Sequence, residues 1–201
     1  EDDQKWIIVD MGVTFADDSI PGIDLIMPDP GFIIDKKDDL LGIVLTHAHE
    51  DHIGAVAHIW PKLKCKLYAT PFTAALLIEK FKEKKIDIAS FLKIVPLNSK
   101  IKLGDFEIDF VTLTHSILEP NGLSIKTPLG TILHTGDWKI DPNPLIGNKI
   151  DEEKLKKIGE TGVSAMICDS TNIFNAGRAG SESDVRDSLL RIMELKTKRI
   201  L

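Results

Sequence analysis

The segment "LTHAHEDHIGAV" (residues 45–56) limits the possible structures of this chain most strongly, because it holds three of the chain's six histidines. The apolar, β-branched stretch "LLGIVLTH" leads into it and predicts a buried strand over residues 40–47. Residues two apart in an extended chain point the same way. We therefore expect His47 and His49 to project together from the end of this strand.

The residues after the strand supply a second group of polar side chains. The chain turns there, and residues 51–60 ("DHIGAVAHIW") can start a helix. Asp51 and His52 lie at that turn, offset from the first pair. Two imidazoles next to a carboxylate and an imidazole suit two neighbouring metal ions better than one. Because these ligands include no thiolate, Zn²⁺ is the favoured ion, with Mn²⁺ or Fe²⁺ as alternatives.

Two later strand ends can complete such a site. The apolar stretch "FVTLTH" ends at His115, and "TILHTGD" ends at Asp137. A single zinc needs three protein ligands and an open position, whereas two zincs need about six ligands, ideally with one bridging carboxylate. A purely structural role hardly explains so many histidines and aspartates at strand ends. By contrast, we interpret His58, in the expected helix, and His134, within a strand, as structural.

The composition is typical of one globular domain. The chain has 201 residues, of which 43% are hydrophobic and 28% charged, enough apolar residues for a core and too many for a disordered chain. No apolar run approaches the roughly 18 residues of a membrane span, so no membrane contact is expected. The net charge of −6 argues against a general polyanion-binding surface. It still allows a nucleic-acid substrate, because metal ions can supply positive charge in a groove.

The two cysteines do not indicate a disulfide framework. Cys65 and Cys168 each lie in an apolar, strand-like run, and neither has CxxC spacing. We expect both to be buried free thiols in a reducing cytoplasm. The missing CxxC spacing also argues against a thiolate zinc site.

The order of expected elements predicts a layered α/β architecture with a mixed sheet, because strands come first and then alternate with helices. Residues 19–33 are rich in Pro and Gly and are expected to form a loop. Helix N-caps are expected at Thr70, Asp151 and Ser181, the last with Asp184 in a capping box. We expect strands at 5–12, 40–47, 65–70, 93–97, 100–115 (broken by a turn at 104–105), 123–137 (a hairpin turning at 128–130), a buried 163–170 and 199–201. We expect helices at 71–85, 151–159 and from Ser181 to about Lys196.

These motifs together resemble a known family. "HAHEDH", a later lone His and a later "TGD" resemble the metallo-β-lactamase fold. Narrower matches, "VDMGVTF" before "PGIDLIMPD", "THSI" before "GLSIKTPLGTILHTGDWKID", and "DSTN", are similar to the ribonuclease J branch of the β-CASP nucleases. The resemblance implies an αββα sandwich with mixed β-sheets flanked by helices. Residues 1–201 would be its N-terminal part, an incomplete domain without the first strand, the β-CASP insertion and the C-terminal return segment.

The resemblance also implies a role for each ligand. One zinc would be held by three imidazoles, those of His47, His49 and His115. The other would be held by Asp51 and His52, with Asp137 bridging the two ions. The inserted β-CASP domain would bring a further histidine ligand for the second ion. We therefore expect the present chain to bind the ion of the three histidines better than the second ion.

Three further positions are compared with the family pattern. Asp10 matches an acidic residue that supports the histidine-rich loop, and Asp169 matches an acidic residue near the metals. Asp51 and Asp169 are candidates for orientation or proton handling, and with Asp137 they form the expected catalytic set. The family usually has Pro-Asp after "THSI", whereas Leu118–Pro120 follows here, so the shape of this loop is not implied by the resemblance.

The implied function is a metal-dependent ribonuclease. The full-length protein would act on single-stranded RNA as an endonuclease and a 5′-3′ exonuclease, hydrolysing phosphodiester bonds with a hydroxide activated by two zinc ions. It would be cytoplasmic and homo-oligomeric, and the present chain alone is expected to be inactive. Two alternatives stay open: another hydrolase of this fold, of thioesterase or lactamase type, and a metal-binding piece without catalysis.

Overall fold

The first half of the chain forms a parallel four-stranded sheet. The structure, a computed structural model, describes residues 4–195, so the strand expected at 199–201 lies outside the described residues. In β4 (Leu40–Val44) the side chains of Leu40, Ile43 and Val44 are buried and that of Leu41 is half-buried, as expected for a strand covered on both faces. The strand order is β1 (Trp6–Val9), β4 (Leu40–Val44), β5 (Leu67–Ala69) and β6 (Leu92–Ile94).

The second half forms a five-stranded mixed sheet. Neighbouring strands run antiparallel except β10 (Gly130–His134) and β11 (Ala165–Ile167), which are parallel. Gly104, with φ +56°, makes the turn between β7 (Lys100–Leu103) and β8 (Phe106–Thr112), a backbone conformation that favours glycine. The strand order is β11 (Ala165–Ile167), β10 (Gly130–His134), β9 (Asn121–Thr127), β8 (Phe106–Thr112) and β7 (Lys100–Leu103).

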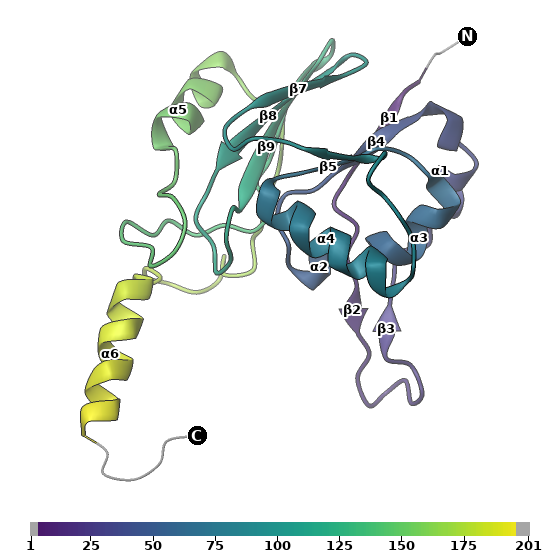
Figure 1. Ribbon diagram of the computed structural model, residues 1–201. Coiled ribbons are helices and arrows are strands. Elements are labelled where there is room, and N and C mark those ends of the chain that lie inside the picture. The colour runs from purple at the N-terminus through teal and green to yellow at the C-terminus, as the bar shows by residue number, and fades with distance from the viewer. Residues whose placement is uncertain (1–3, 196–201) are drawn as a thin grey trace.

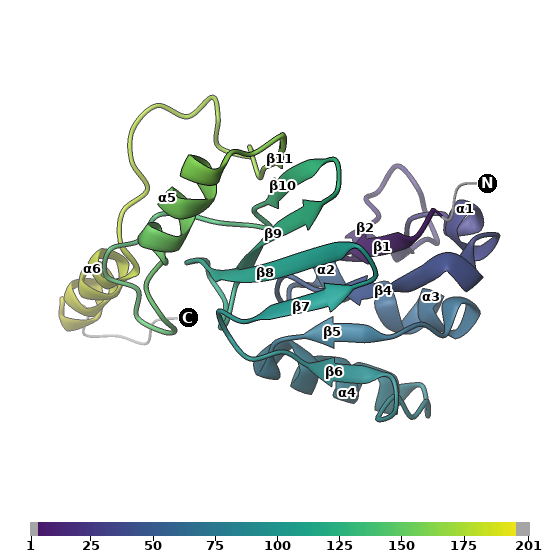
Figure 2. The ribbon, with the colours of Figure 1, turned by 90° about the horizontal axis from the view of Figure 1, so that it is seen from above.

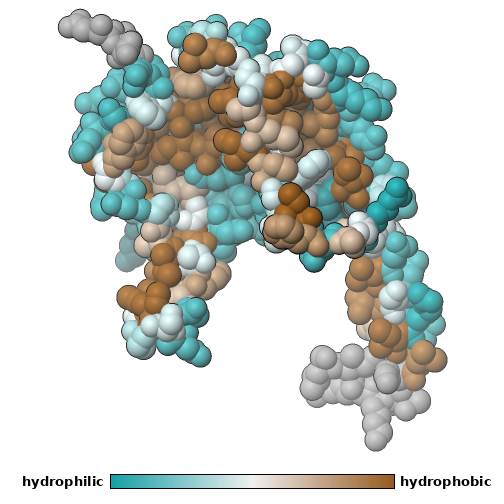
Figure 3. All heavy atoms as spheres, turned by 180° about the vertical axis from the view of Figure 1, so that it is seen from behind, coloured by the Kyte–Doolittle hydropathy of each residue, from teal (hydrophilic) through white to brown (hydrophobic). Residues whose placement is uncertain are grey.

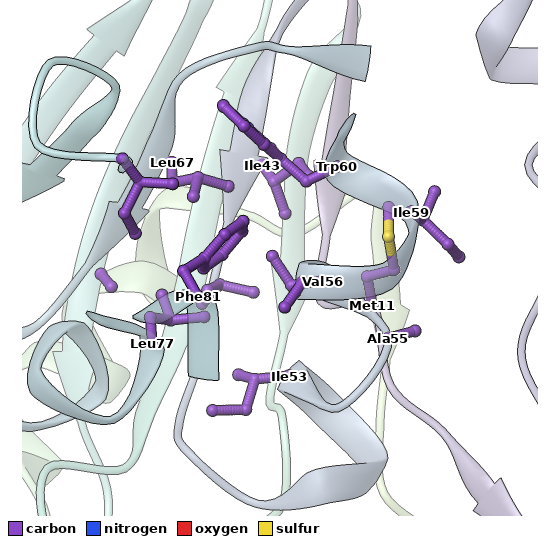
Figure 4. Packing of buried hydrophobic residues seen from close by; sticks show 14 of the residues in the cluster. Met11, Ile43, Ile53, Ala55, Val56, Ile59, Trp60, Leu67, Leu77 and Phe81 are labelled. Carbon is purple, nitrogen blue, oxygen red and sulfur yellow. The ribbon is translucent and has the colours of Figure 1, made fainter. Parts of the chain in front are cut away.

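Two apolar cores hold these layers together. One lies between the first sheet and the helices α3 (Val56–Leu63) and α4 (Pro71–Glu83) (Figure 4). The other lies between the two sheets, where Val44 packs among apolar side chains such as Phe110. Helix α5 (Glu152–Thr161) flanks the second sheet (Figure 2). The layers are therefore helix, sheet, sheet and helix, and the predicted αββα architecture is confirmed. The second sheet is mixed, as predicted, whereas all strand pairs of the first sheet are parallel.

Several short elements lie at one end of the sandwich. Helix α2 (Glu50–Ile53) follows β4, and the two-stranded hairpin of β2 (Thr14–Phe15) and β3 (Leu25–Ile26) projects beyond it (Figure 1). The predicted loop over 19–33 thus contains β3 and the short helix α1 (Gly31–Ile34). A 3-10 turn, η1 (Lys37–Asp39), leads into β4.

Helix α6 (Glu182–Glu194) extends away from both sheets (Figure 1). The predicted capping box of Ser181 and Asp184 is present at its start. Apolar side chains remain exposed along the helix, where they form a brown surface in Figure 3. No helix within residues 4–195 has the length and apolar character needed to cross a membrane.

The strand predicted as buried over 163–170 is exposed, so that prediction is wrong. It is reduced to β11, the edge strand of its sheet, and Met166 and Ile167 are 53% and 55% exposed. Cys168 is exposed as well, which corrects the expectation of two buried thiols. Cys65 is buried, and this burial raises the pKa of its thiol to about 11.

Candidate metal centre

The six predicted ligands meet at one end of the sandwich. His47 and His49 follow β4, and Asp51 and His52 lie in α2. The second sheet contributes the other two, from the segments after β8 and β10. The side chains form two overlapping groups with ligand atoms within 4.8 Å of one another: His47, His49, His115 and Asp137 in one, and Asp51, His52 and Asp137 in the other.

The first group has the spacing of a tetrahedral metal site. His49 Nδ1 lies 3.1 Å from His47 Nε2 and 3.1 Å from His115 Nε2. His115 Nε2 is 3.6 Å from Asp137 Oδ2. Tetrahedral zinc with metal–nitrogen bonds of about 2.0–2.1 Å places its ligand atoms about 3.3 Å apart. The nitrogen of His49 therefore lies at about the ligand spacing of a zinc ion from both other imidazoles.

The second group is more open. His52 Nε2 lies 3.1 Å from Asp137 Oδ1 and 3.7 Å from Asp51 Oδ2. The side chain of Asp51 is 65% exposed, whereas that of His52 is 14% exposed. Asp137 presents one oxygen to each group, as a bridging carboxylate requires. The second metal position thus has Asp51, His52 and the shared Asp137 as ligands, which leaves room for another ligand.

The charge state of His47 favours metal binding. Burial, together with the neighbouring imidazoles of His52, His115 and His49, lowers its pKa to about 2. His47 is therefore neutral near pH 7, and neutral imidazole is the form that binds a metal ion. Burial also lowers the pKa of His115.

Asp10 orients both the loop and His52. It follows β1 with φ 59°, and its carboxylate accepts hydrogen bonds from the Thr46 backbone N–H (2.8 Å) and hydroxyl (2.7 Å). Its Oδ2 also lies 2.7 Å from His52 Nδ1. Burial lowers the pKa of His52, but the hydrogen bond and charge of Asp10, with the charges of Asp137 and Asp51, outweigh it and raise that pKa overall. The loop support expected of Asp10 is thus present.

Gly12 lets the chain after β1 approach helix α2 closely. Met11 N–H donates to the His52 carbonyl (2.7 Å), and Val13 N–H donates to the Glu50 carbonyl (3.0 Å). A Cβ atom on Gly12 would lie 1.7 Å from the carbonyl oxygen of Asp51. No side chain fits there, so the position of α2 depends on this glycine.

Gly12→Ala should therefore displace α2 with its ligands Asp51 and His52. We expect a loss of about 1–3 kcal/mol in the free energy of unfolding, as for other overpacked sites, and weaker binding of the second zinc. Urea unfolding and zinc titration measure the two effects. Gly159→Ala is the matched control, because open space surrounds Gly159 in α5 and alanine favours helix by up to about 1 kcal/mol. Equal behaviour of the two variants would contradict the prediction.

The loop that carries His115 is fixed by a residue outside the family pattern. Glu119 Oε2 accepts a hydrogen bond from Phe72 N–H (2.8 Å) at the start of α4. Thr70 is the N-cap residue as predicted, but its side chain makes no capping bond. The Glu119 carboxylate accepts a hydrogen bond from the first turn of α4 in its place. Asn121 continues the connection, because its backbone N–H donates to the Thr46 carbonyl (3.1 Å).

Asp169 lies beside the first group and outside both ligand groups. Thr171 donates to its carboxylate from the backbone N–H (2.9 Å) and the hydroxyl (2.7 Å). These bonds, with a further one from the Trp138 N–H, lower its pKa, and the charge of His115 lowers it further. His58 is exposed and contacts Lys84 (3.3 Å). His134 Nδ1 accepts from the Gly136 N–H (3.0 Å), in keeping with a structural role.

Three residues near the site have no role in the sequence-based prediction. Thr46 is fully buried and connects Asp10 to the histidine loop. Lys139 and Asp141 follow Asp137 and link this segment to α6. The motif "HTGDWKID" contains both of these residues, but their partners are distant in sequence, so the motif alone gave no signal of the contact.

A family model described as "Metallo-beta-lactamase superfamily" matches residues 1–201. The chain belongs to the metallo-β-lactamase superfamily. A crystal structure of a protein of unknown function from Enterococcus faecalis V583 has the same fold, with a TM-score of 0.58 and 18% identity, and the match covers 96% of this chain and 52% of that one. Within this metallo-β-lactamase domain, the two ligand groups combine residues that follow β4 with residues that follow β8 and β10.

The resemblance to ribonuclease J is confirmed by curated relatives of that name. The protein from Sinorhizobium meliloti is 44% identical over 192 residues, which cover 94% of this chain and 34% of the relative. The protein from Corynebacterium glutamicum is 40% identical over 205 residues, which cover 100% and 28%. The protein from Helicobacter pylori strain 26695 is 39% identical over 186 residues, which cover 92% and 27%. The chain spans about a third of the length of these relatives.

Proposed function

We propose that this chain carries the metal centre of a ribonuclease that hydrolyses phosphodiester bonds in single-stranded RNA. The observation that carries the proposal is the pair of ligand groups that share Asp137. Phosphodiester hydrolysis needs charge stabilisation on both the attacking and the leaving oxygen, and two-metal sites provide it. The ribonuclease J relatives support RNA as the substrate.

The site residues have distinct tasks in this proposal. His47, His49 and His115 would hold one zinc, and Asp51 and His52 the other, with Asp137 shared. Bound divalent ions supply Lewis-acid stabilisation of the phosphoryl charge and activate water at neutral pH. Manganese would suit the same nitrogen and oxygen ligands.

The aspartates complete the proposed catalytic set. Asp51 is exposed enough to reach a substrate phosphate or a water. Asp169 is held by three hydrogen-bond donors, which lower its pKa, so its carboxylate is suited to orienting a neighbouring group and less suited to holding a proton. Asp10 orients His52 from outside the ligand set.

The wider context is also proposed from the relatives. Residues 1–201 would form the N-terminal part of the metallo-β-lactamase domain in a protein with a β-CASP insertion, cutting RNA internally and from the 5′ end. The greater length of the relatives supports this assignment. The whole protein would be a homo-oligomer. The free thiols of Cys65 and Cys168 support a cytoplasmic location.

A chimera tests this function. The chain would replace the matching segment of the Sinorhizobium meliloti ribonuclease J, to which it is 44% identical over 192 residues. We expect the chimera to hydrolyse 5′-monophosphorylated single-stranded RNA and to lose this activity on chelation. The same chimera with His49→Ala is the control and should be inactive, and the 201-residue chain alone should show little or no RNA hydrolysis.

A folded, zinc-loaded chimera that leaves RNA intact would contradict the proposal. Hydrolysis of a thioester or a β-lactam by that chimera would instead favour the other hydrolases of this fold. Zinc binding without turnover of any of these substrates would favour a metal-binding role without catalysis.

A further inference from the structure

A buried carboxylate lies where the segment after Asp137 meets helix α6. The side chain of Asp141 is fully buried. Its two oxygens accept hydrogen bonds from the Asn143 N–H (2.9 Å) and from the Glu182 N–H in the first turn of α6 (2.9 Å). Lys139 Nζ lies 3.4 Å from the same carboxylate. Asp141 thus holds the start of α6 and a lysine of the ligand-bearing segment together.

The backbone of the same residue is bound to the other ligand-bearing segment. Asp141 N–H donates to the Thr114 hydroxyl (3.2 Å). Thr114 and Lys139 form an antiparallel bridge, in which Lys139 N–H donates to the Thr114 carbonyl (2.9 Å) and the Thr114 hydroxyl donates to the Lys139 carbonyl. Thr114 precedes the ligand His115, and Lys139 is two residues after the ligand Asp137. This bridge therefore sets how the two ligands, 3.6 Å apart, face each other.

Helix α6 is held to the rest of the molecule through its first turn. The hydroxyls of Ser181 and Ser183 both donate to the Asn143 carbonyl (2.9 Å each). The Glu182 carboxylate accepts from Leu145 N–H (3.1 Å) and lies 3.3 Å from Lys139 Nζ. Further along the helix the apolar side chains are about half exposed: Val185, Leu189, Leu190, Ile192 and Met193. The orientation of α6 thus depends on the cluster around Asp141.

At neutral pH the charge of the Asp141 carboxylate is balanced by the groups around it. Burial alone would raise the pKa of Asp141, but hydrogen bonds from Glu182, Asn143, Ser181 and Lys139 outweigh it and lower the pKa to about 2. The carboxylate is therefore ionised and pairs with the Lys139 ammonium. Removing it would leave two backbone N–H groups without their acceptor and the Lys139 ammonium with the Glu182 carboxylate alone.

We propose that Asp141 is a positioning residue that couples helix α6 to the metal ligands His115 and Asp137. Whatever moves or holds α6 acts on the Thr114–Lys139 bridge through this carboxylate, and so on the spacing of the two ligands. The inference rests on the proposed metal site, because it concerns the geometry of that site. It adds a residue that touches neither metal nor substrate and still sets metal affinity.

The test compares two aspartates of the 201-residue chain that each accept a hydrogen bond from the first turn of a helix. Asp141→Ala removes the acceptor of the Glu182 N–H and leaves the Ser181–Asp184 capping box of α6 in place. Asp151→Ala removes the N-cap side chain of α5, which accepts from Lys154 N–H (3.0 Å). Both variants should lower the thermal midpoint. Only Asp141→Ala should weaken Zn²⁺ binding, by about 10–100-fold as for other residues that support metal ligands, and change the visible absorption band of bound Co²⁺. Asp141→Asn keeps the size and one acceptor oxygen of the side chain, so it should show a smaller loss of Zn²⁺ affinity. It is the variant to measure if Asp141→Ala does not fold.

The outcomes separate this inference from the proposed function. Unchanged Zn²⁺ affinity and an unchanged Co²⁺ band in folded Asp141→Ala or Asp141→Asn would overturn the coupling and leave the metal site intact. An equal loss of affinity in Asp151→Ala would overturn it as well, because the effect would then follow from general destabilisation. A wild-type chain that binds neither ion would overturn the proposed function itself.

Discussion

Asp137→Ala should weaken both metal positions at once, because Asp137 is the residue that the two ligand groups share. The loss of affinity should exceed the roughly 10–100-fold that removing a mere supporting residue costs. Elemental analysis after dialysis against a fixed zinc concentration, together with calorimetric titration, measures the number of ions and their affinities. Circular dichroism without metal checks that the variant is folded.

Asp51→Ala is the matched control for this prediction. Asp51 belongs to the second group alone and its side chain is largely exposed, so this variant should lose the weaker ion and keep the ion of the three histidines. If Asp51→Ala and Asp137→Ala lose the same ions, Asp137 does not bridge the two positions.

Phe81→Ala should cause the largest loss of stability, about 3–5 kcal/mol in the free energy of unfolding. Phe81 is fully buried in the core under the first sheet, and its ring packs edge-to-face on Trp60 with centroids 5.4 Å apart (Figure 4). The substitution removes this aromatic contact and leaves a cavity. Urea unfolding at 25 °C measures the change.

The control is the same substitution at an exposed position. The side chain of Phe174 is 98% exposed, so Phe174→Ala should change the free energy of unfolding by no more than about 0.5 kcal/mol. A loss of stability at Phe174 as large as that at Phe81 would show that the described core is not the main source of stability.

Local rules predicted much of the site. The two-residue period of an extended chain places His47 with His49, and both lie in the first ligand group. The apolar runs before His115 and Asp137 predicted strands, and β8 and β10 lie there. Asp51 and His52 were expected at a turn from which residues 51–60 can start a helix, and they lie in helix α2. His115 and Asp137 were expected to join the site because they close strands, where loops meet. The division of the ligands between two ions came from the family resemblance.

What the sequence did not predict depends on contacts between distant residues. The apolar pattern of 163–170 is that of a buried strand, and only the sheet order shows that β11 is an edge strand. Thr70 has the right residue type for a capping bond, but Glu119 makes the contact from the His115 loop. The partners Asp141 and Glu182 are 41 residues apart, so no local period could reveal them. Strands as short as β2 and β3 lie below what periodicity can detect.

The division of the ligands between the two sheets affects the stability of the sandwich. Four ligands follow β4 of the first sheet, and His115 and Asp137 extend from the second. A bound cation is therefore a cross-link between the two halves, and separating them requires releasing it. Its binding free energy adds to the cohesion of the halves, by about 2.7 kcal/mol when the free cation is at 100 times its dissociation constant. Chelation would thus weaken the association of the two sheets as well as empty the metal centre.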